Sequence, residues 1–447
     1  MKHVNRILAL ILALVFVLAA LAGCAGKEDP STATEPKGSD APSDSNKPSE
    51  DVSVDTIQFA ALYPLTGASA TTGNNMANGI RLAVDIINDE YDIDLPGAKT
   101  SGITSMGGAK LDVVFGDTQA DPQKGMSAAE QVLTDNENAV AVIGCLNSAV
   151  AATIGTVTER LGKVFISPDC VNPGLCENGW KYFFRATPNS NMFIKNEVDF
   201  LSDMNSVKNA GIKTIALFYD NSLNGSDFRD LIKPILEERG FEVVEEVCFA
   251  ANSPELTSEV QKLKKADADV VISAAYLSDM ILFTKTCQEQ DYAPKMLLVD
   301  GGIGQAEYAE TLGDASDYGI NRAGFMTDLA ETKPAMKAVD QMYYERHGIH
   351  MDDDSARAFM GVIILADALE RAGSTDTEKL RDALAATDLN GDDCILAWDG
   401  VAFDEKGQNT RGRGMMGQLF DGTPKTVWPF EIASEEVVYP QPAWNER

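Results

Sequence analysis

Three side chains that follow two short apolar runs near the middle of the chain have the chemistry of a small-molecule binding site. Ser148 follows the run 140–143, and Asp169 and Cys170 follow the run 164–166. A serine hydroxyl donates and accepts hydrogen bonds, and a carboxylate accepts them or pairs with a cation. Capping is the structural alternative, because Ser148 can cap a helix and Asp169 can cap a turn. The residue types therefore indicate either ligand recognition, with Asp169 facing a cationic group, or capping.

The elements that would position these side chains form one βαβ unit. Runs 140–143 and 164–166 are apolar and β-branched, as expected for buried strands, and 149–161 has the length of a helix. The carboxyl ends of neighbouring parallel strands open a crevice in which small ligands bind. Segments 144–148 and 167–171 should line this crevice, which places Val171 beside Asp169 and Cys170.

Strands and helices alternate on both sides of this unit. The alternation predicts two doubly wound α/β lobes, with a boundary near 187–190, where R-A-T-P-N-S interrupts the pattern. Asp121 is expected to cap a helix that has Pro122 at its first position. The predicted strands are 56–63, 111–117, 140–143, 164–166, 182–186, 214–219, 242–249, 269–274 and 295–299, and the predicted helices between them are 75–90, 149–161, 190–209, 226–239, 254–266 and 278–290.

The carboxyl-terminal third departs from the alternation. Helical segments are predicted at 334–347, 355–372 and 377–386, followed by short strands at 395–398, 401–404, 415–420 and 427–432. A chain that leaves the second sheet for helices and then returns to strands has crossed between the lobes more than once. The fold class is thus α/β, with two Rossmann-like lobes joined by a multi-strand hinge.

The first 53 residues are predicted to be a targeting sequence and a tether rather than part of a folded domain. Residues 1–23 have the three parts of a secretory signal, and Leu21-Ala22-Gly23-Cys24 resembles the bacterial lipobox, in which the cysteine is lipidated. A plain signal peptide cut nearby is the alternative. Residues 24–53 lack aromatic residues and predict a disordered tether. We expect the protein at the cell membrane, anchored by lipid on its extracytoplasmic face.

The mature chain is strongly acidic. Lys2 and Arg6 leave with the signal, so 35 basic residues face 68 acidic ones, a net charge of −33. Such a charge argues against nucleic acid as a partner.

Six cysteines remain after Cys24, and no C-x-x-C motif occurs. Cys170 and Cys176 share a loop and are the first candidates for a disulfide, whereas the alternative is that the cysteines are small buried hydrophobes. No zinc or redox motif is indicated.

Metal and nucleophilic chemistry have little support in the sequence. His347 and His350, with Asp352–Asp354 nearby, form an H-x-x-H pattern, but no second ligand cluster accompanies it and a polar loop explains the composition. Neither G-x-S-x-G nor H-E-x-x-H occurs. We therefore expect no metal, no cofactor and no enzyme activity, although a lipid-anchored hydrolase remains a rival hypothesis.

Four stretches in order along the chain resemble the branched-chain amino acid binding family of ABC importer solute-binding proteins, which have the type I periplasmic-binding fold. They span about 57–408. The stretches are I-Q-F-A-A-L-Y-P-L-T-G-A-S-A-T-T-G with G-I-R-L-A-V-D-I-I-N, the loops V-I-G-C-L-N-S-A-V-A and F-I-S-P-D-C-V-N-P-G-L, the helix A-D-A-L-E-R-A-G-S-T-D-T-E-K-L-R-D-A-L, and the turn F-D-E-K-G-Q.

The resemblance implies a two-lobed clamp of the Venus-flytrap kind that closes over a small ligand. Residues 54–187 with 324–395 would form the first lobe, and 188–323 with 396–447 the second. Relatives use a first-lobe serine for the ligand, and Ser148 stands at that position. Val171 stands where relatives have threonine or serine.

The resemblance also implies ligand contacts from the second lobe. Asn224 and Tyr276 occupy positions at which relatives present tyrosines, Asp300 is the nearest acid for the ligand ammonium, and Thr72 would line the side-chain end of the pocket. Tyr276 is otherwise a half-buried tyrosine, and Asp300 a solvated acid before G-G-I-G. The replacements at Val171 and Asn224 point away from leucine, isoleucine and valine as the ligand.

These observations favour capture of an amino acid or related polar solute and its delivery to an ABC permease by a monomeric, membrane-anchored protein. A sensor that presents its closed form to a receptor is the second rival hypothesis. The resemblance, rather than composition, implies the permease as partner.

Overall fold

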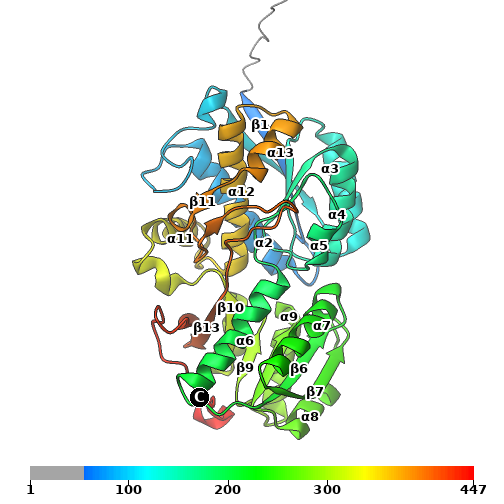
Figure 1. Cartoon of the computed structure of the whole chain (residues 1–447), viewed down its shortest axis with the longest axis vertical. Helices are drawn as coiled ribbons and strands as arrows, with labels where there is room; N and C mark the ends of the chain where they lie inside the picture. Colours follow the sequence, from blue (N-terminus) through cyan, green and yellow to red (C-terminus); the bar gives the residue numbers. More distant parts are fainter. Residues whose placement is uncertain (1–54) are drawn as a thin grey trace, which may run out of the picture. The chain divides into compact units, whose positions relative to one another are not determined.

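The computed structural model describes residues 55–447. The predicted signal peptide, the lipidation site Cys24 and the tether lie outside the described residues. Within 55–447, no helix is both long enough and apolar enough to cross a membrane. The described chain forms two α/β lobes, each built on its own sheet (Figure 1).

The first sheet has five parallel strands in the order β2-β1-β3-β4-β5. Its strands are β1 (Thr56–Tyr63), β2 (Lys110–Asp117), β3 (Ala141–Gly144), β4 (Val164–Ser167) and β5 (Phe183–Arg185).

Side chains of β1 alternate between two cores, as expected for a strand that is covered on both faces. Phe59 and Ala61 belong to one core, and Ala60 and Leu62 to the other. The first core is shared by α2 (Ala70–Asn88), α11 (Pro334–His347), α12 (Asp353–Ala372) and α13 (Thr377–Ala385), and the second by α3 (Pro122–Asp135), α4 (Ser148–Leu161) and α5 (Gly174–Glu177).

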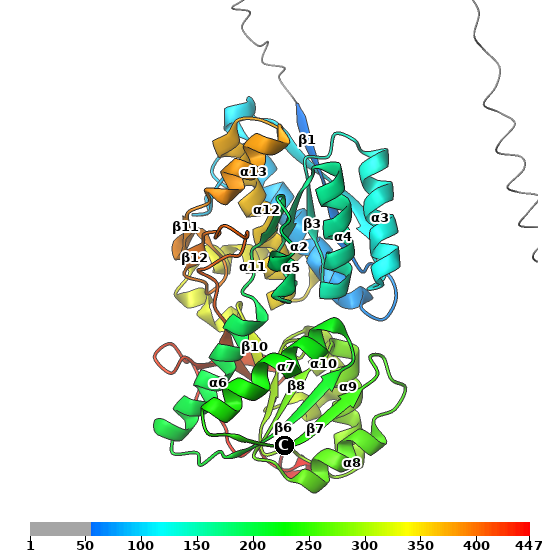
Figure 2. The same cartoon turned by 45° about the vertical axis from the view of Figure 1, so that its right-hand side comes forward.

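The second sheet has seven strands in the order β14-β13-β10-β9-β8-β6-β7 (Figure 2). Strands β6 to β10 are parallel to one another. β13 runs antiparallel to both of its neighbours, β10 and β14. The strands are β6 (Thr214–Asp220), β7 (Glu242–Phe249), β8 (Val270–Ala274), β9 (Leu297–Val299), β10 (Ile320–Ala323), β13 (Met415–Phe420) and β14 (Thr423–Trp428). The helices of this lobe are α6 (Ser190–Ser206), α7 (Leu223–Glu238), α8 (Thr257–Ala266), α9 (Leu277–Glu289) and α10 (Ala306–Leu312).

Three segments carry the chain between the lobes. The first joins β5 to α6, the second joins β10 to α11, and the third runs to β13 from the small ribbon of β11 (Leu389–Asn390) and β12 (Gly400–Val401). The first and third touch, because Arg185 and Gln408 form a parallel bridge. The predicted multi-strand hinge corresponds to these connections.

Helices α2 and α12 carry several residues of the site described below, and they cross very closely. A Cβ atom placed on Gly79 of α2 would lie 2.3 Å from the backbone oxygen of Ser355 in α12. Only glycine permits that approach. The start of α12 is fixed by a capping box in which the Asp352 side chain accepts a hydrogen bond from the backbone N–H of Ser355, at 2.7 Å.

Most predicted elements are present, although the predicted strand 401–404 is shifted and shortened to Gly400–Val401 and the predicted strand 427–432 is shifted to Thr423–Trp428. Two further predictions are wrong. Asp121 caps α3 by accepting from the backbone N–H groups of Gln123 and Lys124. The predicted strand 395–398 is not a strand, because its backbone is held by other groups: Lys333 Nζ donates to Leu396 O at 2.6 Å. Asp352 and its neighbours, taken from the sequence as a polar loop, open α12 instead.

Candidate functional site

A pocket lies where the carboxyl edges of the two sheets meet. The space that the centre of a water molecule can occupy in it is about 70 Å³. Its walls come from the loop before α2, the loops after β3, β4, β8 and β9, the start of α7, strand β10 and the first turns of α12. The lining residues are Ala68, Ser69, Thr72, Leu146, Ser148, Asp169, Val171, Asn224, Ala275, Tyr276, Leu277, Ser278, Asp300, Gly301, Gly302, Gln305, Arg322, Asp354 and Arg357.

The pocket brings together seven of the eight residues proposed from the sequence. They are Thr72, Ser148, Asp169, Val171, Asn224, Tyr276 and Asp300. Residues more than 200 positions apart in the chain thus share one cavity. Ser148, Asp169 and Val171 were expected here because parallel strands deliver the loops that follow them to one edge, whereas the other four were expected from the resemblance.

Cys170 is the residue that the pocket lining leaves out. Its thiol is buried and donates to the backbone oxygen of Cys145 at 2.8 Å, and the two sulfur atoms lie 3.7 Å apart. Every cysteine among the described residues is a free thiol, so the suggested disulfide between Cys170 and Cys176 is absent. The reason is geometric, since Cys170 turns toward Cys145 on the neighbouring loop.

Ser148 and Val171 stand next to each other across the two first-lobe loops. Ser148 is the first residue of α4, and its hydroxyl accepts a long hydrogen bond, 3.4 Å, from the backbone N–H of Asn172. The backbone oxygen of Val171 already accepts from the backbone N–H of Ser190 at 2.8 Å. Val171 therefore offers the pocket its apolar side chain, and Ser148 keeps its hydroxyl hydrogen available for a ligand.

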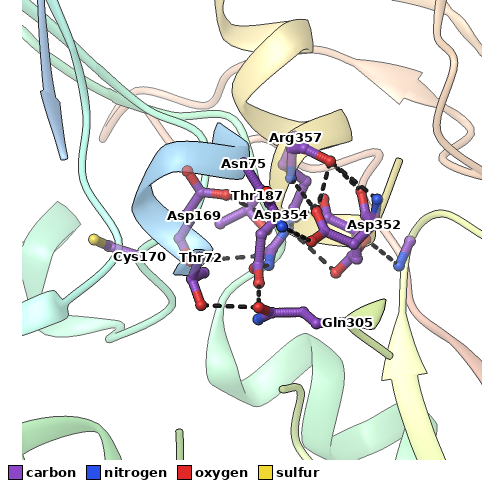
Figure 3. A network of polar contacts seen from close by, with 12 residues as sticks. Thr72, Asn75, Asp169, Cys170, Thr187, Gln305, Asp352, Asp354 and Arg357 are labelled. Carbon is purple, nitrogen blue, oxygen red and sulfur yellow. Dashed lines mark hydrogen bonds and ion pairs between the residues drawn. The ribbon is translucent and has the colours of Figure 1, made fainter. Parts of the chain in front are cut away.

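A network of buried charges forms the first-lobe wall (Figure 3). Arg357 pairs with the side chain of Asp354, and its Nε lies 3.2 Å from Asp353 Oδ2 and 3.6 Å from Asp169 Oδ1. Burial alone would lower the pKa of Arg357, but the three carboxylates outweigh it and raise the pKa. Arg357 is therefore a permanent cation that joins α12 to the loop after β4.

Burial raises the pKa values of two carboxyl groups in this wall. Burial raises the pKa of Asp354 to about 6, although the charge of Arg357 opposes the rise. Burial also raises the pKa of Asp169 well above its usual range, with Arg357 opposing and Asp354 adding to the rise. Asp169 is the carboxylate that the network solvates least.

A second buried ion pair forms the opposite wall. Arg322 Nε donates to Asp300 Oδ1 at 2.6 Å, and the exposed fractions of the two side chains are 5% and 6%. The guanidinium carbon lies over the ring of Phe193, 3.6 Å from its centroid. Its Nη1 has no hydrogen-bond partner among the described residues. Arg322 therefore has one guanidinium nitrogen without a partner, and Asp300 is held by arginine rather than free for a ligand.

Gln305, in the loop before α10, connects the two walls directly (Figure 3). Its Oε1 accepts from the hydroxyl of Thr72 at 2.9 Å, and its Nε2 donates to Asp354 Oδ2 at 3.0 Å. Thr72 and Asp354 belong to the first lobe, and Gln305 follows β9 of the second. We call these two hydrogen bonds the Gln305 bridge.

Gln305→Ala should loosen the contact between the lobes. Loss of two hydrogen bonds, one of them to a carboxyl group, should shift the equilibrium toward separated lobes by about 1–3 kcal/mol. Small-angle scattering of the unliganded variant should then give a larger radius of gyration than the parent protein. Glu310→Ala, a change at an exposed position of α10, is the control and should leave the radius unchanged. An unaltered radius in Gln305→Ala would show that the bridge does not hold the lobes together.

A second cavity adjoins the inner pocket. The space for the centre of a water molecule is about 220 Å³ there, and Gly301, Gly302, Gln305, Arg322, Asp354 and Arg357 line both cavities. The far side is more apolar and includes Phe325, Met326 and Ile349. The six shared residues thus form a polar partition between a small inner pocket and a larger chamber.

Sequence reasoning missed Gln305, Arg322, Asp354 and Arg357. The available signal for the last two was an arginine set in the apolar run of α12, with acidic residues three and four positions before it. Such spacing places the charges on one helix face. The signal for Arg322 was weaker, because I-N-R-A does not resemble a buried strand by composition.

The H-x-x-H pair does not form a metal centre in the described part of the chain. His350 Nδ1 lies 2.8 Å from Asp340 Oδ2, and no group of three or more metal-binding side chains occurs among residues 55–447. His350 therefore pairs with Asp340, a carboxylate whose side chain is only 9% exposed.

Comparison with known proteins gives a consistent result. Residues 56–422 match the family described as periplasmic binding protein. The chain is 25% identical over 395 residues to the Leu/Ile/Val-binding protein homolog 7 of Brucella suis biovar 1 (strain 1330), covering 86% of this chain and 94% of that protein.

Two solved structures share the fold. The branched-chain amino acid transporter substrate-binding protein LivJ from Streptococcus pneumoniae str. Canada MDR_19A, in complex with isoleucine, has a TM-score of 0.70 at 22% identity and covers 86% of this chain and all (100%) of that one. A solute-binding protein of an ABC transporter from R. palustris, in complex with benzoate, has a TM-score of 0.69 at 16% identity and covers 83% and 95%. Proteins of this architecture thus bind ligands of different charge.

Proposed function

Because the chain belongs to the periplasmic binding protein family, we propose that it captures an amino acid or related small polar solute between its lobes and delivers it to an ABC permease. Its relatives form the branched-chain amino acid ABC transporter substrate-binding family. The single observation that carries the proposal is the pocket lined by strand ends of both sheets. A ligand held there contacts both lobes at once.

The mechanism is a shift of population. A ligand that touches both walls gains its second set of contacts only when the lobes are together, so it favours the closed form by that difference. The closed form is then the one that the permease would accept. No bond in the ligand breaks, and the ligand leaves unchanged.

The amino-terminal segment completes the proposal. Lipidation at Cys24 would keep the protein at the extracytoplasmic face of the membrane, with residues 24–53 as a tether. The protein would act there as a monomer. Export would also place the ligand site outside the cell, where solute is captured.

A ligand screen tests the function. Thermal denaturation of the purified protein with amino acids, small amides and aromatic acids should show a rise in melting temperature for one class, because a ligand that binds only the folded state stabilises it by mass action. Mass spectrometry of the recovered ligand should find it intact. A ligand that is converted to product would replace capture by catalysis.

Ser148→Ala should weaken binding of that ligand by about 1 kcal/mol or more, the scale of one lost hydrogen bond. Calorimetric titration measures the dissociation constant. Thr156→Ala on the exposed side of the same helix is the matched control and should bind like the parent. An unchanged dissociation constant in Ser148→Ala would remove Ser148 from the site.

A further inference from the structure

Asp169 is a buried carboxylate whose hydrogen-bonding capacity is largely unused. Its side chain is 1% exposed and lines the inner pocket. Oδ1 has no hydrogen-bond partner among the described residues, and Oδ2 receives only a long contact, 3.4 Å, from the Tyr63 hydroxyl. A carboxylate withdrawn from water in this way is costly unless a donor or cation meets it. The structure therefore leaves one place in the pocket where a ligand cation gains more than any neutral group.

Arg357 does not fill that place. Its nearest atom, Nε, is 3.6 Å from Asp169 Oδ1, which is beyond hydrogen-bond distance. Its other nitrogens are engaged with Asp354 and, at 3.4 Å, with the Thr187 hydroxyl. One guanidinium is thus shared among three carboxyl groups, and Asp169 holds the smallest share.

The charges of the inner pocket do not balance. Three carboxyl side chains line it, those of Asp169, Asp300 and Asp354, against the guanidiniums of Arg322 and Arg357, so one carboxyl group has no cation to match it when ionised. Asp353, which also pairs with Arg357 at 3.2 Å, increases the excess. A ligand with no net charge leaves this imbalance in place, and an anionic ligand makes it worse.

The second lobe adds negative charge at the same edge. Asp220 ends β6, is 1% exposed, and its Oδ2 has no hydrogen-bond partner among the described residues. After burial, its charge is the next cause that raises the pKa of Tyr276 in the pocket wall. Tyr276 therefore stays neutral beside this carboxylate.

Resting on the function proposed above, we propose that the solute carries a net positive charge, with a protonated amine against Asp169 Oδ1. A basic amino acid or a small diamine is the chemical class. Arg322, which lines the opposite wall and whose Nη1 has no hydrogen-bond partner among the described residues, would donate to a carbonyl or carboxylate oxygen of the same ligand. The amine and the acceptor then satisfy the two orphan groups, one on each lobe.

Calorimetric titration of the purified protein at pH 7.5 tests this class. The probes are L-lysine and putrescine as cations, L-norleucine as the neutral analogue of lysine without its terminal amine, L-leucine, and benzoate as an anion. We expect the tighter cation to bind at least about tenfold more strongly than L-norleucine, because hydrogen bonds to a charged partner are the strong ones. A neutral or anionic probe that binds more tightly than both cations overturns the inference and leaves the proposed function intact.

Asp169→Asn separates the named contact from general attraction. It should weaken binding of the cation at least about tenfold and change binding of L-norleucine less than about threefold. Asp367→Asn, which changes a carboxylate on α12 outside the pocket, is the matched control and should bind the cation like the parent. An unchanged cation affinity in a folded Asp169→Asn protein overturns the assignment, and the comparison of lysine with norleucine in the parent stands if the variant does not fold. Absence of binding by every probe and every solute of the wider screen refutes the proposed function itself, and this inference with it.

Discussion

Replacing Arg357 by methionine is expected to lower the free energy of unfolding by about 3–5 kcal/mol, the cost of removing one partner from a buried ionic network. The arginine side chain is 7% exposed and is the cation that Asp353, Asp354 and Asp169 share. Without it, three largely buried carboxyl groups remain with no cation beside them. Urea denaturation followed by circular dichroism measures the change.

Arg346→Met is the matched control for Arg357→Met. Arg346 makes an ion pair with Asp85 at 2.5 Å, but the side chains are 35% and 49% exposed. Exposed pairs contribute about 0–1 kcal/mol, so this variant should lose no more than that. Adding Asp354→Asn and Asp169→Asn to Arg357→Met should restore part of the stability. If Arg357→Met unfolds at the same urea concentration as the parent, the network does not support the fold.

Glu197→Met is expected to raise the free energy of unfolding by about 1–3 kcal/mol at pH 8, because it removes a buried polar group that has no partner. Glu197 lies on α6 and is 0% exposed, and neither carboxyl oxygen has a hydrogen-bond partner among the described residues. Burial raises its pKa strongly, and the charge of Asp300 adds to the rise while Arg322 opposes it. The fold therefore favours the protonated acid.

The benefit of Glu197→Met should grow with pH. Between the pKa of glutamate in the unfolded chain, about 4.3, and the raised pKa in the fold, the native state keeps a proton that the unfolded state releases. Stability of the parent protein therefore falls as pH rises through this window. Asp354 and Asp279, each with a pKa raised to about 6, contribute in the same direction.

Thermal denaturation between pH 5 and 8 checks this dependence. The melting temperature of the parent should fall toward pH 8, and that of Glu197→Met should fall less. Glu238→Met at the exposed end of α7 is the control, with an expected change within about 0.5 kcal/mol at every pH. A variant that melts below the parent at pH 8 would mean that ionised Glu197 stabilises the fold.

The sequence was most informative where a local pattern determines the local structure. Runs of apolar residues of strand length predict β1 and β7, and the pairing of Asp121 with Pro122 marks the start of α3. Strand β10 was not predicted. Its residues Asn321 and Arg322 are polar, and they are buried only because β9 and β13 flank the strand and Asp300 neutralises the arginine. That compensation is tertiary and leaves no periodic signal.

The same contrast between local patterns and tertiary contacts applies to the candidate site. The first-lobe loops with Ser148 and Asp169 were predictable, because topology brings the ends of parallel strands to one edge, and the second-lobe residues followed only from the family resemblance. The charged residues of the walls were not, because a single chain does not show which acid an arginine meets. Arg357 and Asp169 are 188 positions apart and belong to different elements. The balance of charge in the pocket, and with it the proposed ligand class, follows only from the folded chain.

The Gln305 bridge also has a kinetic consequence. Because side chains of the protein alone make this bridge, we expect the closed arrangement to form without ligand, so that a solute binds only after the lobes open. The apparent affinity is then the intrinsic affinity multiplied by the fraction of molecules whose lobes are open. At high solute concentration, the rate of binding would be limited by the rate at which the lobes open rather than by diffusion. The strength of the hydrogen bonds of Gln305 would then help to set that rate.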